Sequence, residues 1–106
     1  MSAAQAPLSD RAAIVGIGAT EFWKDSGRSE LRLAVEAVSA ALEDAGLRPE
    51  EVDGMATFTM DNNPEIEVNR NLGGGDLRFF SRTHYGGGAA CAPVLHAAMA
   101  VATGVC

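Results

Sequence analysis

The sequence has few cationic residues, and this shortage excludes one large class of partners. Its 106 residues contain 8 Lys and Arg against 14 Asp and Glu, which gives a formal net charge of −6. Lys24 is the only lysine, and the arginines are scattered along the chain. Nucleic-acid-binding proteins show the opposite balance, with cationic side chains clustered on one face. DNA or RNA is therefore not an expected partner.

Long apolar runs are also missing. No run approaches the length of about 20 residues that crosses a bilayer, so no membrane span is expected. The opening residues are rich in Ala, Ser, Gln and Pro and lack the basic start and apolar core of a secretory signal. We expect residues 1–11 to be a flexible leader, residues 12–106 to be one partial domain, and the compartment to be the cytoplasm.

Cysteine is scarce, and its spacing carries no metal-site pattern. Cys91 and Cys106 are expected to be thiols in a reducing cytoplasm. They form no CxxC pair, and His84 and His96 do not stand at metal-ligand spacing with them. We therefore expect neither a metal site nor a bound cofactor.

The apolar residues that are present predict an α/β fold. Residues Ala12–Ile17 form a continuous apolar run, which is typical of a strand buried on both faces. Ser29 is a plausible N-cap for a helix that extends to Ala45, and Gly46 is placed to end it. The apolar side chains of this helix recur at three- and four-residue steps, at Leu31, Ala34, Val35, Val38, Leu42 and Ala45.

Five further elements are expected in the second half of the chain. They are a helical turn opened by Pro49, a strand over Asp53–Thr59, a short helix over Glu65–Leu72, a third strand over Leu77–Thr83 and a helix over Ala89–Thr103. The last helix is rich in alanine and has no charged residue, so it should be buried nearly all round, inside a larger protein or against a partner. His96 in its middle is expected to be buried and hydrogen-bonded.

Two glycine motifs invite a functional interpretation. Gly16-Ile17-Gly18 follows the first strand, but position 21 is Glu21 where a dinucleotide-binding fingerprint needs glycine. A tight turn that leaves the strand is the favoured interpretation. The second motif, Gly86-Gly87-Gly88, precedes the apolar helix, where free N–H groups can face a ligand or an oxyanion, or where glycine simply permits close packing.

Residues beside the second motif supply two further candidates. His84 and Tyr85 precede the glycines and could reach a ligand in the same pocket. Cys91 in the first helical turn has the position of an activated nucleophile. A small apolar residue that fills space among alanines is the favoured role for Cys91.

The order of these parts resembles the N-terminal half of the thiolase superfamily, and it is closest to the lipid-transfer or sterol-carrier-type branch. Val15-Gly16-Ile17-Gly18 is followed by a long loop, then by a helix that ends in Ala41–Leu47, then by Pro49–Gly54 entering a strand. The resemblance extends from about Ala12 to the end of the chain. It implies a truncated α/β fold, with a mixed sheet around a buried central helix.

The resemblance also bears on the reaction. In the family a nucleophilic cysteine opens the central helix, seventeen residues before a glycine that corresponds to Gly104. That position holds Gly87, whereas Cys91 stands only thirteen residues before Gly104. The nucleophile is thus expected to be absent, as in members that cleave a β-hydroxyacyl-CoA by a retro-aldol reaction in lipid or steroid side-chain degradation. That reaction needs a base and a stabilised enolate oxygen, but no acyl-enzyme.

The substrate implied by the resemblance is a coenzyme A thioester, and the implied partners are a second copy of the chain and an OB-fold, zinc-ribbon subunit. The acyl or pantetheine path would be lined by His84, Tyr85, Gly86, Gly87 and Gly88, with the remaining catalytic residues outside this sequence. Two alternatives stay open. One is acyl transfer by an acetyl-CoA acetyltransferase or thiolase that uses Cys91, and the other is a non-catalytic acyl-CoA-binding or dimerisation module. The 106 residues alone are not expected to be active.

Overall fold

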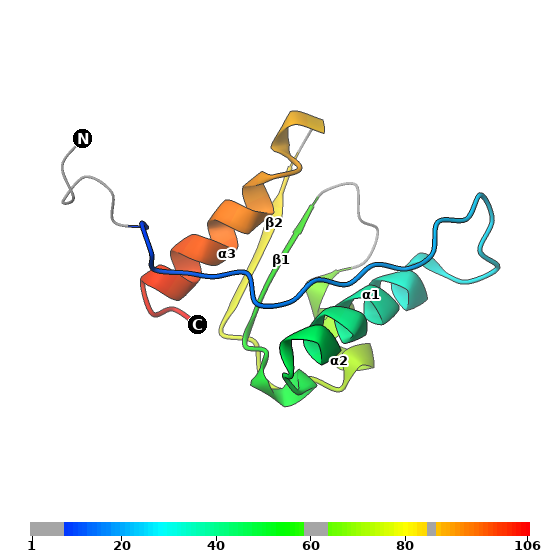
Figure 1. Cartoon of the computed structure of the whole chain (residues 1–106), viewed down its shortest axis with the longest axis horizontal. Coiled ribbons are helices and arrows are strands. Elements are labelled where there is room, and N and C mark those ends of the chain that lie inside the picture. The colour runs from blue at the N-terminus through cyan, green and yellow to red at the C-terminus, as the bar shows by residue number, and fades with distance from the viewer. Residues whose placement is uncertain (1–7, 59–63, 85–86) are drawn as a thin grey trace.

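The computed structural model describes residues 8–58, 64–84 and 87–106, and it shows an α/β fold (Figure 1). The elements in chain order are helix α1 (Glu30–Ala45), the single turn η2 (Pro49–Glu51), strand β1 (Gly54–Phe58), helix α2 (Glu65–Leu72), strand β2 (Phe79–Thr83), the single turn η3 (Gly87–Ala89) and helix α3 (Ala92–Ala102). The sequence predicts all of these elements except the turn η3. The strands and α3 are shorter than predicted, and Thr59 lies outside the described residues.

Helix α1 begins and ends where its sequence predicts. The Ser29 hydroxyl accepts a hydrogen bond from the Arg32 N–H at 3.1 Å, which satisfies one of the free amides of the first turn. At the other end, Gly46 adopts φ 72°, a left-handed conformation that favours glycine, and its N–H bonds to the Glu43 carbonyl. Both predicted caps are confirmed.

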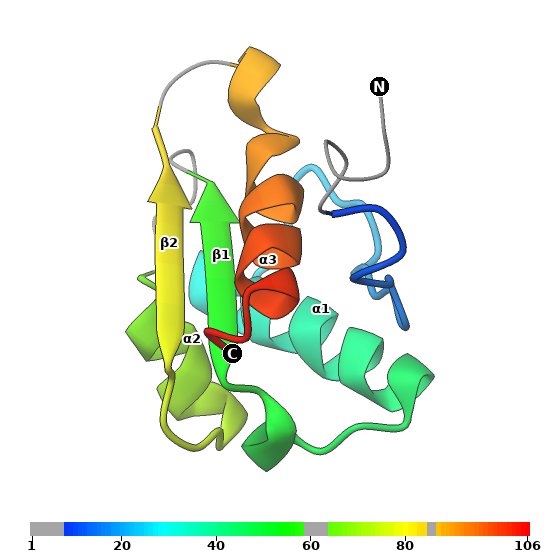
Figure 2. The same cartoon turned by 90° about the vertical axis from the view of Figure 1, so that its left-hand side faces the viewer.

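The sheet lies between helices. Strands β1 and β2 pair in parallel, from Gly54 opposite Phe79 to Phe58 opposite Thr83. Helix α3 packs against both strands, α2 packs against β1, and α1 packs on α2 (Figures 1 and 2). The sequence predicts a mixed sheet. In the described residues the sheet consists of two parallel strands.

The first predicted strand is not formed, and this is a correction. Residues 12–17 are extended but unpaired, and Ile14 and Ile17 are each 77% exposed. A strand needs a neighbouring backbone, and this segment runs beside α1 instead, where the Ile17 N–H donates to Asp44 at 3.0 Å. Gly16 and Gly18 permit that approach, because a Cβ at position 16 would lie 2.5 Å from the Ala41 carbonyl oxygen. The two glycines therefore serve close packing and form no tight turn.

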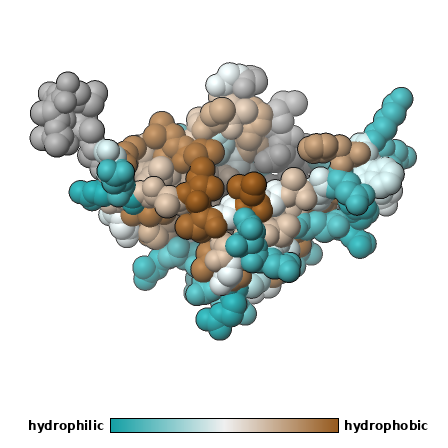
Figure 3. All heavy atoms as spheres, in the orientation of Figure 1, coloured by the Kyte–Doolittle hydropathy of each residue, from teal (hydrophilic) through white to brown (hydrophobic). Residues whose placement is uncertain are grey.

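Helix α3 is only partly covered within this chain. Ala100 is its one buried residue, whereas Val94, Leu95, Met99 and Val101 are each between 46% and 58% exposed. Apolar side chains gather on the face shown in Figure 3, over α3 and the neighbouring extended segment. The predicted burial on all sides is therefore not found among the described residues.

The beginning of the described chain is a short turn. Of the predicted leader, residues 1–7 lie outside the described residues. Residues 8–11 form a turn that the Arg11 N–H closes on the Leu8 carbonyl at 3.3 Å, with Asp10 at φ 58°.

Candidate functional site

The carboxyl ends of β1 and β2 meet at one edge of the sheet, because the strands are parallel and Phe58 stands opposite Thr83. The chain leaves this edge at His84 and returns through η3 into α3 (Figure 2). Ligands of α/β sheets bind outside the carboxyl ends of the strands. This edge is therefore the first place to look for a site.

Three of the five predicted site residues can be placed there. His84 directly follows β2 and is exposed, while Gly87 and Gly88 begin η3. Tyr85 and Gly86 lie outside the described residues. Among the described residues, a Cβ built at Gly88 would meet nothing within 4 Å, so packing against them does not explain the glycine at this position. The interpretation that remains is access, in which the absent side chain lets a ligand approach the backbone of Gly88.

The N-terminus of α3 follows this turn and carries no side-chain cap. Cys91 is the N-cap residue and makes no capping hydrogen bond, and the first turn of α3 contains no acidic residue. The positive end of the helix dipole is thus not neutralised by its own first turn. Cys91 is exposed, so within the described residues it does not fill a core as predicted.

Two threonine hydroxyls near the strand ends were missed by the sequence analysis. The hydroxyl oxygens of Thr57 and Thr83 are buried and have no hydrogen-bond partner among the described residues. Thr83 is the last residue of β2 and directly precedes His84 in the sequence. A buried hydroxyl without a partner costs about 1–3 kcal/mol, which a ligand or further protein groups could recover.

A second polar group joins β2 to α3. The Ser81 hydroxyl lies 3.0 Å from His96 Nδ1, so the predicted hydrogen bond of His96 is confirmed, although its ring is only half-buried. This pair borders a hollow of about 330 Å³ whose lining is otherwise mostly apolar. The lining residues are Phe79, Ser81, His96, Met99, Ala100, Thr103 and Val105.

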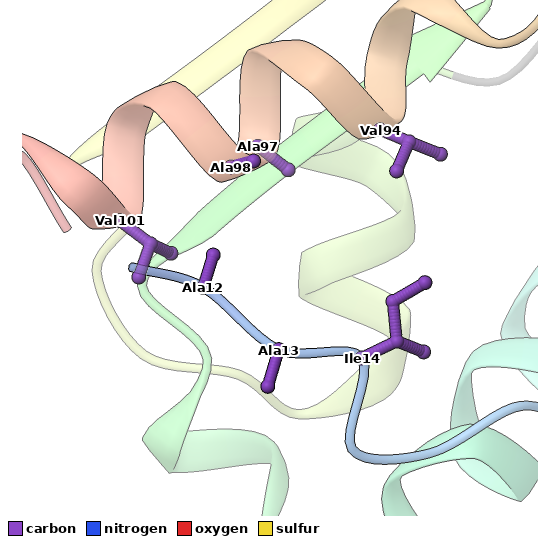
Figure 4. Close-up of a pocket in the computed structure, with 7 residues that line it drawn as sticks. All are labelled: Ala12, Ala13, Ile14, Val94, Ala97, Ala98 and Val101. Carbon is purple, nitrogen blue, oxygen red and sulfur yellow. The ribbon is translucent and has the colours of Figure 1, made fainter. Parts of the chain in front are cut away.

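A third feature is the apolar hollow between α3 and the extended segment, about 310 Å³ in volume. Figure 4 shows its lining, which comes from Ala12, Ala13, Ile14, Val94, Ala97, Ala98 and Val101. None of these side chains can donate, accept or ionise. The hollow can therefore hold apolar groups but cannot perform acid–base or nucleophilic chemistry.

Cys106 lies at the opposite end of the sheet from the turn that Gly87 and Gly88 begin, which we call the glycine turn. A Cβ at Gly54, the first residue of β1, would lie 2.7 Å from its Sγ atom. Burial raises the pKa of the Cys106 thiol, and the nearby negative charge of Asp53 raises it further. The group is thus a protonated thiol at neutral pH, a poor nucleophile.

The described residues contain neither a metal-binding cluster nor a membrane-spanning helix. They contain no group of three His, Cys, Asp or Glu side chains that could hold a metal ion. None of their helices is both long enough and apolar enough to cross a membrane.

Comparison with known proteins identifies the fold. Over 98 residues the chain is 72% identical to a 17-hydroxy-3-oxo-4-pregnene-20-carboxyl-CoA lyase of Mycobacterium tuberculosis and 66% identical to a steroid side-chain-cleaving aldolase of Thermomonospora curvata. Each match covers 92% of this chain and 25% of the relative. The chain therefore spans about a quarter of the length of the curated relatives it matches. No family model matches it.

Two solved structures agree with these relatives. The Ltp2-ChsH2(DUF35) aldolase superposes with a TM-score of 0.85 at 68% identity, over 88% of this chain and 24% of that one. A monomeric SCP2-thiolase-like protein type 1 of Mycobacterium smegmatis superposes with a TM-score of 0.69 at 28% identity, over 86% of this chain and 20% of that one. The fold is thiolase-like. Helix α3 lies where the family resemblance predicts the central helix, and the glycine turn lies at its start.

Proposed function

We propose that this chain forms part of an enzyme that cleaves a carbon–carbon bond in the side chain of a steroid acyl-CoA. The observation that carries the proposal is the identity of 72% and 66% to a lyase and an aldolase, both of which act on steroid side chains by name. Because the chain spans a quarter of these relatives, the activity belongs to a larger assembly of which these residues supply one part.

The chemistry follows from the substrate named for the lyase. In 17-hydroxy-3-oxo-4-pregnene-20-carboxyl-CoA, the thioester carbonyl is attached to C20 and the hydroxyl to the adjacent C17, so the compound is a β-hydroxyacyl-CoA. A base removes the hydroxyl proton, the C17–C20 bond breaks, and its electron pair moves into the thioester as an enolate. Protonation of C20 then gives a steroid 17-ketone and a shorter acyl-CoA. The step needs no covalent acyl-enzyme.

The chain's own residues suit the thioester end of this reaction. The open space at Gly88 lets a substrate approach the backbone, and the uncapped N-terminus of α3 favours developing negative charge. His84 and the Thr83 hydroxyl supply polar groups on the strand side of the same turn. We propose that these groups, with Tyr85 and Gly86, line the acyl or pantetheine path, and that Gly87 replaces a nucleophilic cysteine.

Partner subunits form part of the proposal. The name of the Ltp2-ChsH2(DUF35) aldolase joins two components, which supports a partner subunit for this protein, and we propose an OB-fold, zinc-ribbon protein. A homodimer is proposed as well, although the thiolase-like protein of M. smegmatis is described as monomeric. Sedimentation of the whole protein, with and without its partner, would measure both associations.

The test is an assay of the whole protein that contains this chain, with its partner subunit, on 17-hydroxy-3-oxo-4-pregnene-20-carboxyl-CoA. Mass spectrometry should show loss of the steroid thioester with formation of the 17-ketone and the shorter acyl-CoA, and the Cys91→Ser variant should retain that activity. Acyl transfer through Cys91 would instead leave an acyl group on the cysteine and be abolished in Cys91→Ser. Tight binding of the thioester without turnover would indicate a non-catalytic acyl-CoA-binding module and refute the proposal.

A further inference from the structure

Helix α3 has one polar side chain available to fix its position on the sheet. Between Ala92 and Ala102 every side chain except His96 is apolar, and five of these ten residues are alanine. Apolar contacts between small side chains carry no direction, so they restrain sliding along the helix axis weakly. A hydrogen bond restrains it strongly, because it weakens steeply when the geometry is lost.

His96 makes such a bond. Its Nδ1 atom lies 3.0 Å from the hydroxyl of Ser81 in the middle of β2. A solvent-open hollow of about 330 Å³ lies beside the pair. Thr103, the other hydroxyl at this hollow, bonds to the Met99 carbonyl of the helix at 2.8 Å and so ties nothing to the sheet.

The position of α3 along its axis determines where the glycine turn stands. Gly87 and Gly88 lead directly into α3, while His84 and Thr83 belong to the end of β2. A slip of one residue moves the helix by about 1.5 Å. That displacement exceeds the tolerance of about 0.5 Å within which a catalytic group must be held.

We infer that Ser81 and His96 form a positioning pair, which holds the glycine turn at the start of α3 in register with the carboxyl end of β2. The pair acts on the candidate site through the helix and does not touch the substrate. This inference rests on the proposed function for its catalytic consequence. Its structural consequence, the placement of Gly88, can be measured separately.

The variants Ser81→Ala and His96→Leu each remove one partner. We expect both to lower kcat of the whole enzyme by about tenfold to a hundredfold with little change in KM, since misplacement of about 1 Å has that effect. In this chain, the amide resonance of Gly88 should shift in both variants. The double variant should resemble either single one, because each change removes the same bond.

Two conservative variants and one control separate positioning from general damage. His96→Asn places an amide nitrogen near the former Nδ1 position, and Ser81→Thr keeps the hydroxyl, so each should restore part of kcat and return the Gly88 resonance toward its original position. Thr103→Val removes a hydroxyl from the same hollow without loosening α3 from β2, and it should leave both readouts unchanged.

The outcomes distinguish the two proposals. If the whole enzyme has no activity on the steroid thioester, the proposed function fails, and the Gly88 resonance still decides the positioning role. If Ser81→Ala and His96→Leu lower the melting temperature but leave the Gly88 resonance where Thr103→Val leaves it, the positioning role is refuted. A double variant whose Gly88 shift equals the sum of the two single shifts would refute it as well, because a shared bond predicts no such addition.

Discussion

Replacing Gly18 by alanine tests whether the extended segment truly rests on α1. A Cβ at this position would fall inside contact distance of the Ala37 carbonyl oxygen and the Ala41 nitrogen, both backbone atoms in the middle of α1. Backbone inside a helix cannot move aside as a side chain can. Overpacking of this kind costs about 1–3 kcal/mol, and the lower entropy of the unfolded alanine variant offsets about 0.4–1 kcal/mol.

The net expectation is a fall of about 1–2 kcal/mol in the free energy of unfolding, measured with urea. Gly75→Ala is the matched control, because a Cβ there would meet the Glu50 carbonyl oxygen at an ordinary 3.7 Å. If the segment detaches from α1 to escape the clash, the Ile17 amide loses its bond to Asp44 and should exchange faster. Equal stability of Gly18→Ala and Gly75→Ala, with unchanged exchange at Ile17, would refute the described contact.

Three further predictions concern the caps and the thiols. Ser29→Ala removes the N-cap of α1 and should cost about 1 kcal/mol in thermal or urea unfolding, whereas Ser39→Ala on the same helix should not destabilise the protein. Gly46→Ala places a side chain at φ 72° and should cost about 1 kcal/mol in the same assay. Iodoacetamide at pH 7 should alkylate the exposed Cys91 before Cys106, by peptide mass spectrometry. The alkylation rate of Cys106 should still be rising with pH at its ordinary pKa of 9.0, since burial and Asp53 raise the pKa of this thiol; equal rates at the two cysteines at pH 7 would contradict this.

The elements that could be predicted from the sequence are those with local signals. Helix α1 is bounded by Ser29 and Gly46, and α2 by the left-handed Gly73 at φ 82°, each within one turn of the helix it caps. Pro49 likewise opens η2 where predicted, because its ring presets the first helical dihedral. Such signals act through the immediate backbone, so distant parts of the chain do not alter them.

The wrong predictions all depended on distant neighbours. The apolar run at residues 12–17 has the composition of a buried strand, but a strand forms only where another backbone edge is available for pairing. Gly16 and Gly18 were interpreted by their sequence pattern, whereas their contacts with Ala41 depend on how α1 crosses the segment. The five candidate site residues are consecutive, so the sequence alone can propose them together, and their role stays a prediction. The Thr83 hydroxyl became a candidate only because it is buried, and its burial cannot be deduced from the sequence.

The composition of α3 explains both its exposure and its dependence on one hydrogen bond. A helix without charged side chains has no face that prefers water. Its exposed side chains are those that the other described residues do not cover, namely Val94, Leu95, Met99 and Val101. The same composition leaves no ion pair to set the helix in register. Apolar burial stabilises contact without selecting one alignment, whereas a single half-buried polar pair can select it. For that reason, the Ser81–His96 bond should matter more for the location of the glycine turn than for the stability of the fold.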